Sequence, residues 1–127
     1  MIKWIESKNE ECYALLRIVA GFLLFWHGSA NLFEFPIANP HDPPYWVLIS
    51  AGVINVVGGA LVVIGLYVRQ TAFICCGFLA FAYWLAHGYK AVLPYVNGGE
   101  LAAILCFVFL YITANGAGIW SLDQRRA

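Results

Sequence analysis

Apolar residues dominate the chain in four long runs, at about residues 12–35, 45–67, 71–93 and 99–115. An α-helix rises about 1.5 Å per residue, so roughly 20 apolar residues cross the hydrocarbon core of a bilayer. No stretch alternates apolar and polar positions in the way that a half-buried strand does. The pattern therefore predicts an all-α fold, an integral membrane bundle of four helices.

The connections between the runs carry turn signals. The first, PIANPHDPP, contains four of the five prolines, which cannot continue a helix. The second is a tight hairpin at residues 68–70, and the third occupies residues 94–98. We therefore expect a single transmembrane domain over residues 1–127.

Composition supports a membrane protein. Hydrophobic residues make up 62% of the 127 residues and charged residues only 11%, whereas soluble domains carry about a quarter charged residues. A chain this short could not bury so much apolar surface in a soluble core. The net charge of zero gives no indication of a nucleic-acid partner. The first run is too long for a signal-peptide core, so we expect it to remain as a span.

Basic residues predict the orientation, because cytoplasmic loops carry an excess of Lys and Arg. If both termini are cytoplasmic, every Lys and Arg except Lys90 lies on that side or at the adjoining helix ends. We expect a multi-pass protein of the bacterial inner (plasma) membrane with both termini in the cytoplasm.

Small and polar residues at helical spacing predict the inward face of each helix, since close backbone approach and interhelical hydrogen bonds drive association in membranes. The predicted inward positions are Arg17, Gly21, Leu24, Gly28 and Asn31 in the first run, Ala51, Gly52, Asn55 and Gly59 in the second, Cys76, Ala80, Tyr83, His87 and Lys90 in the third, and Glu100, Ile104, Phe107, Tyr111 and Ala114 in the fourth.

One polar group lies near the predicted outer boundary, within roughly 10 Å of it. It consists of His27, Asn31, His87 and Glu100, a candidate outer-side pocket for a quinone head group or a small substrate. Glu100 has a second interpretation, because Asn97 and Glu100 have the N-x-x-E spacing of a capping box. The two histidines either contact a quinone, ligate haem or pack as hydrogen-bonded structural residues, and two histidines alone are a weak haem signal. We do not expect haem.

A second polar group, Arg17 and Asp123, lies at the inner side. Arg17 shares a helix face with glycines, and Asp123 follows the last run after Gly116 and Gly118 allow the chain to turn back. We predict that Asp123 folds under the bundle and pairs with Arg17. The alternative is a role in binding an anionic ligand or a partner.

The cysteines show no disulfide framework and no metal-binding spacing. Cys75 and Cys76 diverge by about 100° on a helix and cannot readily bridge, and Cys106 is expected several ångströms higher in the bilayer. We expect inert packing residues. The chain has no Ser-His-Asp set, phosphate loop, paired metal carboxylates or H-E-x-x-H motif, so nothing in it indicates a hydrolase.

Three segments carry a family resemblance. They are LLRIVAGFLLFWHGSANLF (15–33), GVINVVGGALVVIGLYVR (52–69) and NGGELAAILCFVFLYITANGAGIWSLD (97–123). Together they resemble the DoxX family of small membrane proteins, whose namesakes are associated with quinone-linked oxidation of sulfur compounds and with terminal oxidase complexes. The resemblance implies a four-helix membrane protein. The positions carried over by the motif are Arg17, His27, Asn97, Glu100, Trp120 and Asp123. Of these we assign structural roles to Arg17, Asn97, Trp120 and Asp123. Asn55 stands where the family commonly has an acidic residue, which removes a mid-membrane proton carrier.

Two hypotheses about function follow. In the first, the protein is a quinone-associated redox component or subunit of a membrane oxidoreductase complex, and a membrane or soluble redox partner supplies most of the electron chemistry. In the second, it is a non-enzymatic scaffold or assembly subunit of a respiratory or redox complex. A transporter is less expected, because the sequence shows no inverted repeat or broken helix.

Overall fold

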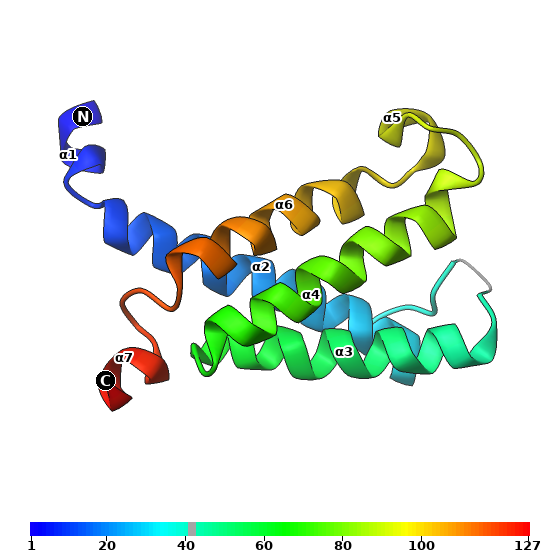
Figure 1. The fold of residues 1–127 in the computed structure, drawn as a ribbon, viewed down its shortest axis with the longest axis horizontal. Helices are drawn as coiled ribbons and strands as arrows, with labels where there is room; N and C mark the ends of the chain where they lie inside the picture. The colour runs from blue at the N-terminus through cyan, green and yellow to red at the C-terminus, as the bar shows by residue number, and fades with distance from the viewer. Residues whose placement is uncertain (41–42) are drawn as a thin grey trace.

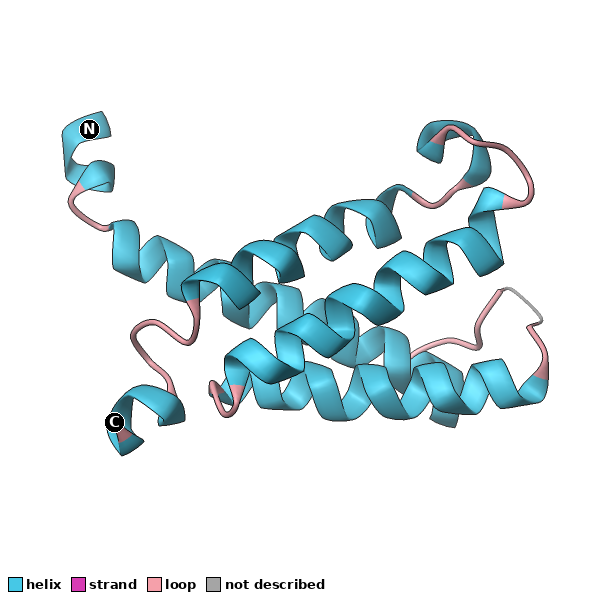
Figure 2. Cartoon of the chain, in the orientation of Figure 1, coloured by secondary structure: helices cyan, strands magenta, loops and turns pink. Residues whose placement is uncertain are grey.

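The computed structural model describes residues 1–40 and 43–127, and all regular structure in these residues is helical (Figures 1 and 2). Four longer helices form a bundle, and short helices lie at its two ends. The longer helices are α2 (Asn9–Phe33), α3 (Tyr45–Ile64), α4 (Val68–Tyr83) and α6 (Glu100–Asn115), and the short elements are α1 (Ile2–Glu6), the π-helical turn η1 (Trp84–Gly88), α5 (Pro94–Asn97) and α7 (Leu122–Arg126). The predicted all-α fold is confirmed.

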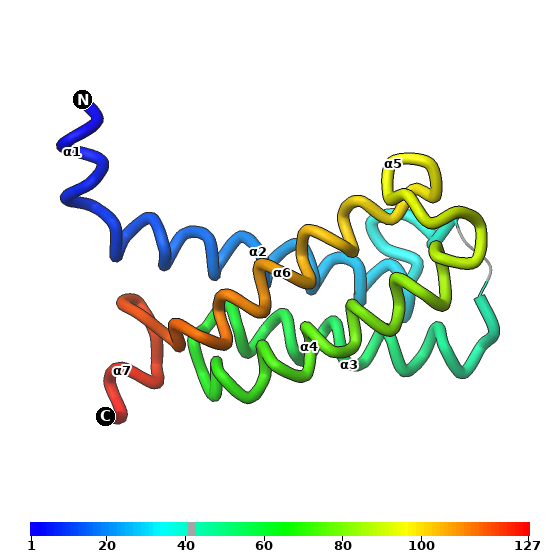
Figure 3. The backbone as a smooth tube through the Cα atoms, turned by 45° about the horizontal axis from the view of Figure 1, so that its top comes forward, coloured from blue at the N-terminus to red at the C-terminus, as the bar shows by residue number. Residues whose placement is uncertain are grey.

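Three of these helices are long and apolar enough to cross a membrane: Asn9–Phe33, Tyr45–Ile64 and the combined Val68–Gly88. The helix α6 is also apolar but has only 16 residues. The second connection was predicted at residues 68–70 but lies at residues 65–67. The helix α3 ends at Ile64 with Gly65 (φ +76°) as its C-cap, and α4 begins at Val68. Both chain termini lie at the same end of the bundle (Figures 1 and 3). That the termini face the cytoplasm stays a prediction.

The helices associate in two hairpin-like pairs, α2 with α3 and α4 with α6. The predicted α2 and α3 faces are confirmed except at Asn31, which is only partly buried. The other predicted residues are all buried: Arg17, Gly21, Leu24 and Gly28 on α2, and Ala51, Gly52, Asn55 and Gly59 on α3. Glycines there let the two backbones approach closely.

A substitution at Gly28 tests this close approach. A Cβ atom added there would lie 2.6 Å from the Val56 backbone nitrogen and 2.8 Å from the Gly52 carbonyl oxygen. Because neither backbone atom can move without separating the helices, we expect Gly28→Ala to cost about 1–3 kcal/mol of unfolding free energy in a detergent denaturation titration. Gly77 has nothing within 4 Å, so Gly77→Ala should be neutral or stabilising. Equal losses at both positions would contradict the interface.

The predicted inward faces of the other two helices are wrong in part. On α4 the buried row contains Cys75 and Leu79, one position away from the predicted row, and Lys90 beyond it is exposed. On α6 the buried residues are Leu105, Phe109 and Ile112, whereas the predicted residues Glu100, Ile104, Phe107, Tyr111 and Ala114 are all exposed. Both sides of α6 are apolar, so hydrophobicity does not distinguish the lipid face from the core face.

Candidate functional site

Arg17 is fully buried, and each hydrogen bond that it makes with the described residues goes to a main-chain carbonyl. Its Nη1 donates to the carbonyls of Val62 and, at 3.0 Å, Val63, in the last turn of α3. Its Nη2 donates to the carbonyls of Ile119 (3.3 Å) and Trp120 (2.8 Å) in the C-terminal tail. The last carbonyls of a helix lack intrahelical partners and carry the negative end of its dipole, so a cation is stabilised there. Arg17 thus joins α2, α3 and the tail.

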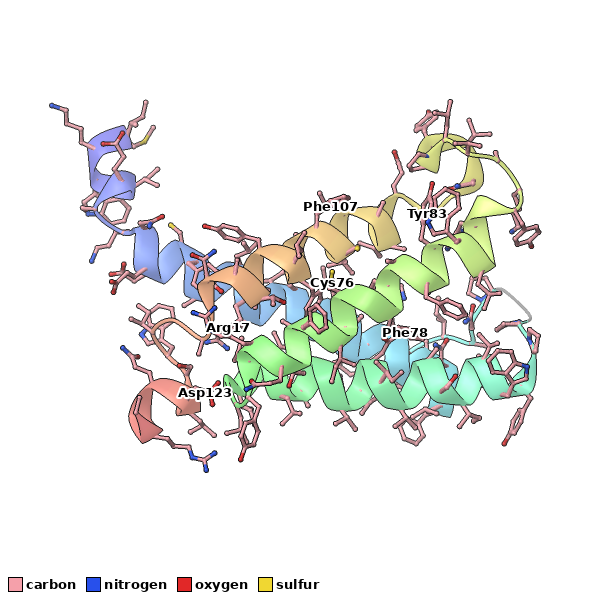
Figure 4. All side chains as sticks on the ribbon, in the orientation of Figure 1. Arg17, Cys76, Phe78, Tyr83, Phe107 and Asp123 are labelled. Carbon is pink, nitrogen blue, oxygen red and sulfur yellow. The ribbon has the colours of Figure 1, made fainter. Side chains whose placement is uncertain are left out.

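Asp123 binds the start of α4, not Arg17. One carboxylate oxygen accepts from the Tyr67 N–H and the other from the Val68 N–H, both at 2.9 Å, and the Asp123 N–H donates to the Gly65 carbonyl. Figure 4 shows Arg17 and Asp123 at the same end of the bundle. Within the described residues, however, the one ion pair is Lys8–Glu11, at 2.9 Å. The predicted ion pair is wrong. Asp123 does fold back under the bundle, where the positive end of the α4 dipole stabilises its negative charge.

Two further side chains complete this arrangement, and the sequence analysis missed both. Arg69 donates from Nη1 to the carbonyls of Thr113 (2.9 Å) and Ala114 (2.6 Å), and from Nη2 to Asn115 (3.1 Å), at the end of α6. The Tyr13 hydroxyl donates to the Gly116 carbonyl at 2.6 Å. The sequence does contain an indication of this contact. The last carbonyls of α6 need donors, basic side chains commonly supply them, and α6 has no basic residue in its own last turn. Ser121 Oγ donates to the Gly118 carbonyl at 2.7 Å and accepts from the Gln124 N–H at 3.2 Å, within the tail itself. We call this set the tail lock; it comprises Tyr13, Arg17, Arg69, Ser121 and Asp123.

A groove of about 470 Å³ lies beside the tail lock, between the start of α2, the end of α6 and the tail. The rings of Tyr13 and Tyr111 meet edge to face in its wall, with centroids 5.8 Å apart. The polar and aromatic side chains along the groove are Asn9, Glu10, Tyr13, Tyr111, Asn115, Asp123 and Gln124, and Ala117, Gly118 and Ile119 complete the lining. The Tyr111 hydroxyl and the side-chain amides of Asn9 and Gln124 make no hydrogen bond in the part of the chain that the structure describes, so they are available to a ligand.

Asn97 organises the opposite end of the bundle. Its Nδ2 donates to the Tyr83 hydroxyl and the Ala91 carbonyl, both at 2.9 Å, and its Oδ1 accepts from the Gly99 N–H at 2.8 Å. The predicted capping box is wrong, because α6 begins at Glu100 with Gly99 as its N-cap. The side chain of Asn97 closes an Asx-type turn before the helix instead.

The predicted outer-side residues lie on different elements. His27 is exposed on α2, and Asn31 accepts a hydrogen bond from Asn39 at 2.7 Å. His87 Nδ1 lies 3.1 Å from the Asn97 carbonyl oxygen, and Glu100 is exposed at the start of α6. The hydrogen bonds observed among the described residues do not join any two of these four side chains. The outer-side pocket stays a prediction.

The cysteines differ from expectation at one point. Cys76 Sγ on α4 and Cys106 Sγ on α6 lie 3.8 Å apart. The predicted separation in depth is therefore wrong. Figure 4 shows Cys76 at the middle of the bundle, on the side facing α6.

Comparison with known proteins identifies the family of the chain. The model of the DoxX family matches residues 12–88, from the start of α2 through η1. This chain belongs to the DoxX family. A relative from Haemophilus influenzae is 40% identical over 130 residues, covers 95% of each chain and is named only as an uncharacterized protein. No solved structure matches the chain.

DoxX membership and the three long apolar helices together make this a multi-pass membrane protein in contact with lipid. The matched range includes Tyr13, Arg17 and Arg69 of the tail lock. It ends before Asp123 and before the Tyr111 side of the groove.

Proposed function

We propose that this DoxX protein is a quinone-associated subunit of a membrane redox complex and that the groove beside the tail lock holds the quinone head group. A quinone head is a flat ring with two carbonyl acceptors, and its reduced form carries two hydroxyl donors. The groove supplies partners for both forms. Tyr111 and the side-chain amides of Asn9 and Gln124 offer O–H and N–H groups, and Glu10 offers carboxylate oxygens. This pairing of donors and acceptors in one groove is the observation that carries the proposal.

The surroundings of the groove suit an amphipathic ligand. Its volume of about 470 Å³ is within the usual range for small-molecule sites. Toward the middle of the bundle, Phe107 and Leu110 on α6 are exposed, so an isoprenoid tail can lie along apolar surface while the head stays in the groove. In this arrangement a membrane or soluble partner supplies the electron chemistry.

Quinone binding to the purified protein in lipid tests the proposal. We expect quinone to co-purify, and Tyr111→Ala to weaken binding of a short-chain quinone roughly tenfold, the effect of losing about 1.4 kcal/mol of binding free energy. Tyr95→Ala is the matched control, because Tyr95 is 85% exposed at the opposite end of the bundle. Loss of binding in His27→Ala or Glu100→Ala, with Tyr111→Ala unaffected, would move the site to the predicted outer-side pocket. No quinone binding in any form would contradict the proposal.

A non-enzymatic scaffold is the second candidate, and one observation favours it. Arg17 and Arg69 donate their hydrogen bonds to main-chain carbonyls, and the Asp123 carboxylate accepts from main-chain N–H groups. These charges hold the C-terminal tail in place. A scaffold would retain a stoichiometric protein partner through purification, without quinone, and would lose that partner when α7 is deleted.

A further inference from the structure

Two thiols touch across the interface between α4 and α6. Cys76 Sγ lies 3.8 Å from Cys106 Sγ, and the Cys106 thiol also donates to the Cys76 carbonyl at 3.5 Å. All four cysteines are free. Cys75 is buried on the neighbouring side of α4, and Cys12 is exposed near the start of α2. The chain therefore contains a contacting thiol pair together with two thiols that serve as internal controls.

The pair lies at the depth of the lipid acyl chains. Counted along α4 and α6, Cys76 and Cys106 are roughly 12–14 Å from the helix ends beside the tail lock. Both thiols are only partly buried. A reactant must therefore dissolve in the bilayer and must be small enough to reach a sulfur between two packed helices. Oxidants that are charged or that do not dissolve in the bilayer cannot reach the pair.

We propose that Cys76 and Cys106 form a redox-active dithiol that reduces a lipid-soluble hydroperoxide and closes to a disulfide between α4 and α6. This inference goes beyond the proposed function and does not depend on quinone binding. A hydroperoxide is an uncharged two-electron oxidant, and its terminal oxygens are less bulky than a quinone ring. Two thiols supply the two electrons and two protons that its reduction requires.

The reaction balances in two steps. We assign the attack to Cys106, because two contacts with Cys76, the sulfur at 3.8 Å and the carbonyl oxygen at 3.5 Å, fix the position of its sulfur between α4 and α6. In the first step Cys106 sulfur takes the terminal oxygen, the O–O bond breaks, and the Cys106 proton goes to the departing alkoxide as an alcohol. This leaves a sulfenic acid. In the second step Cys76 sulfur attacks Cys106 sulfur, the S–S bond forms, and the hydroxyl leaves with the Cys76 proton as water.

The second step needs only a small movement of the two side chains. The sulfurs must close from 3.8 Å to about 2 Å, a change within reach of side-chain rotation about the Cα–Cβ bonds. Because the attack is intramolecular, it competes well against reaction with an external thiol. The sulfenic acid should therefore not accumulate when both cysteines are present.

The test uses the full chain in nanodiscs, reduced and then treated anaerobically with cumene hydroperoxide. We expect alkylatable cysteines to fall from four to two, one cumyl alcohol to form per protein, and peptide mapping to show Cys76 joined to Cys106. Cys106→Ser should abolish both alcohol formation and the cross-link. Cys76→Ser should still form alcohol and should leave a sulfenic acid on Cys106 that dimedone traps. Cys12→Ser and Cys75→Ser should behave as the wild type.

Several results would overturn the inference. Four alkylatable cysteines after treatment would show that the pair is inert, and a cross-link that persists in Cys106→Ser would assign the reaction to other thiols. Oxidation of the pair by a short-chain quinone but not by the hydroperoxide would identify a different oxidant. Size-exclusion profiles that match the wild type confirm that the serine variants are folded, and the dimedone readout in Cys76→Ser supplies an independent measurement if Cys106→Ser is lost.

Discussion

Arg17→Ala is expected to remove roughly 3–5 kcal/mol of unfolding free energy, because hydrogen bonds from a charged donor contribute more than neutral ones and their loss leaves buried carbonyls unpaired. The guanidinium is 0% exposed and donates to the last turn of α3 and to the tail, so one truncation releases both. We expect a lower midpoint in a detergent denaturation titration and faster proteolysis of residues 116–127.

Two variants control the Arg17 experiment. Arg17→Lys keeps the positive charge but replaces a planar fork with one ammonium group, which cannot serve both pairs of carbonyls, so we expect it to recover only part of the loss. Arg125→Ala removes an exposed arginine at the same end of the bundle and should change stability by less than about 0.5 kcal/mol. If Arg17→Ala were as stable as Arg125→Ala, Arg17 would not hold the tail.

The sequence predicted that Arg17 points inward but not what it binds. The inward direction follows from helical spacing, since Arg17 shares a face with Gly21 and Gly28. Its partners are main-chain carbonyls, which every residue carries, so no residue type in the sequence marks them. Asp123 is the acidic residue that follows the last run, and the pairing hypothesis used it for that reason. The unpaired main-chain groups at helix ends also bind charged side chains. Here Arg17 binds carbonyls at the end of α3, and Asp123 binds N–H groups at the start of α4.

The faces of α2 and α3 were predictable and that of α6 was not, for one physical reason. Glycines mark the α2–α3 interface because backbones approach closely there. On α6 the polar members of the predicted face were Glu100 and Tyr111, which lie toward the helix ends where polar groups meet the membrane surface. Lipid makes the outer face as apolar as the core, so the packed residues Leu105 and Phe109 carry no distinguishing signal.

The groove could not be predicted, because the tail conformation creates it. Tyr13 on α2 and Tyr111 on α6 are far apart in sequence and form one wall, and the other wall comes from tail residues that reach the groove only after the chain reverses beyond α6. That reversal uses positive φ at Gly116, Gly118 and Trp120. Glycine adopts this region readily, and the two glycines were expected to turn the chain, but a tryptophan there is uncommon. The structural role predicted for Trp120 corresponds to a backbone position whose carbonyl binds Arg17.

Asp123→Ala separates the two interpretations of the tail. It removes both acceptors from the Tyr67 and Val68 N–H groups, so we expect a loss of about 2–3 kcal/mol in unfolding free energy. The more specific readout is hydrogen exchange, because the amide protons of these two residues should lose protection before the rest of α4 does. Glu11→Ala is the matched control, since it breaks the surface ion pair with Lys8 and should leave both amides unchanged. If protection at Tyr67 and Val68 persisted in Asp123→Ala while stability fell, the carboxylate would be acting on Arg17 and not on α4.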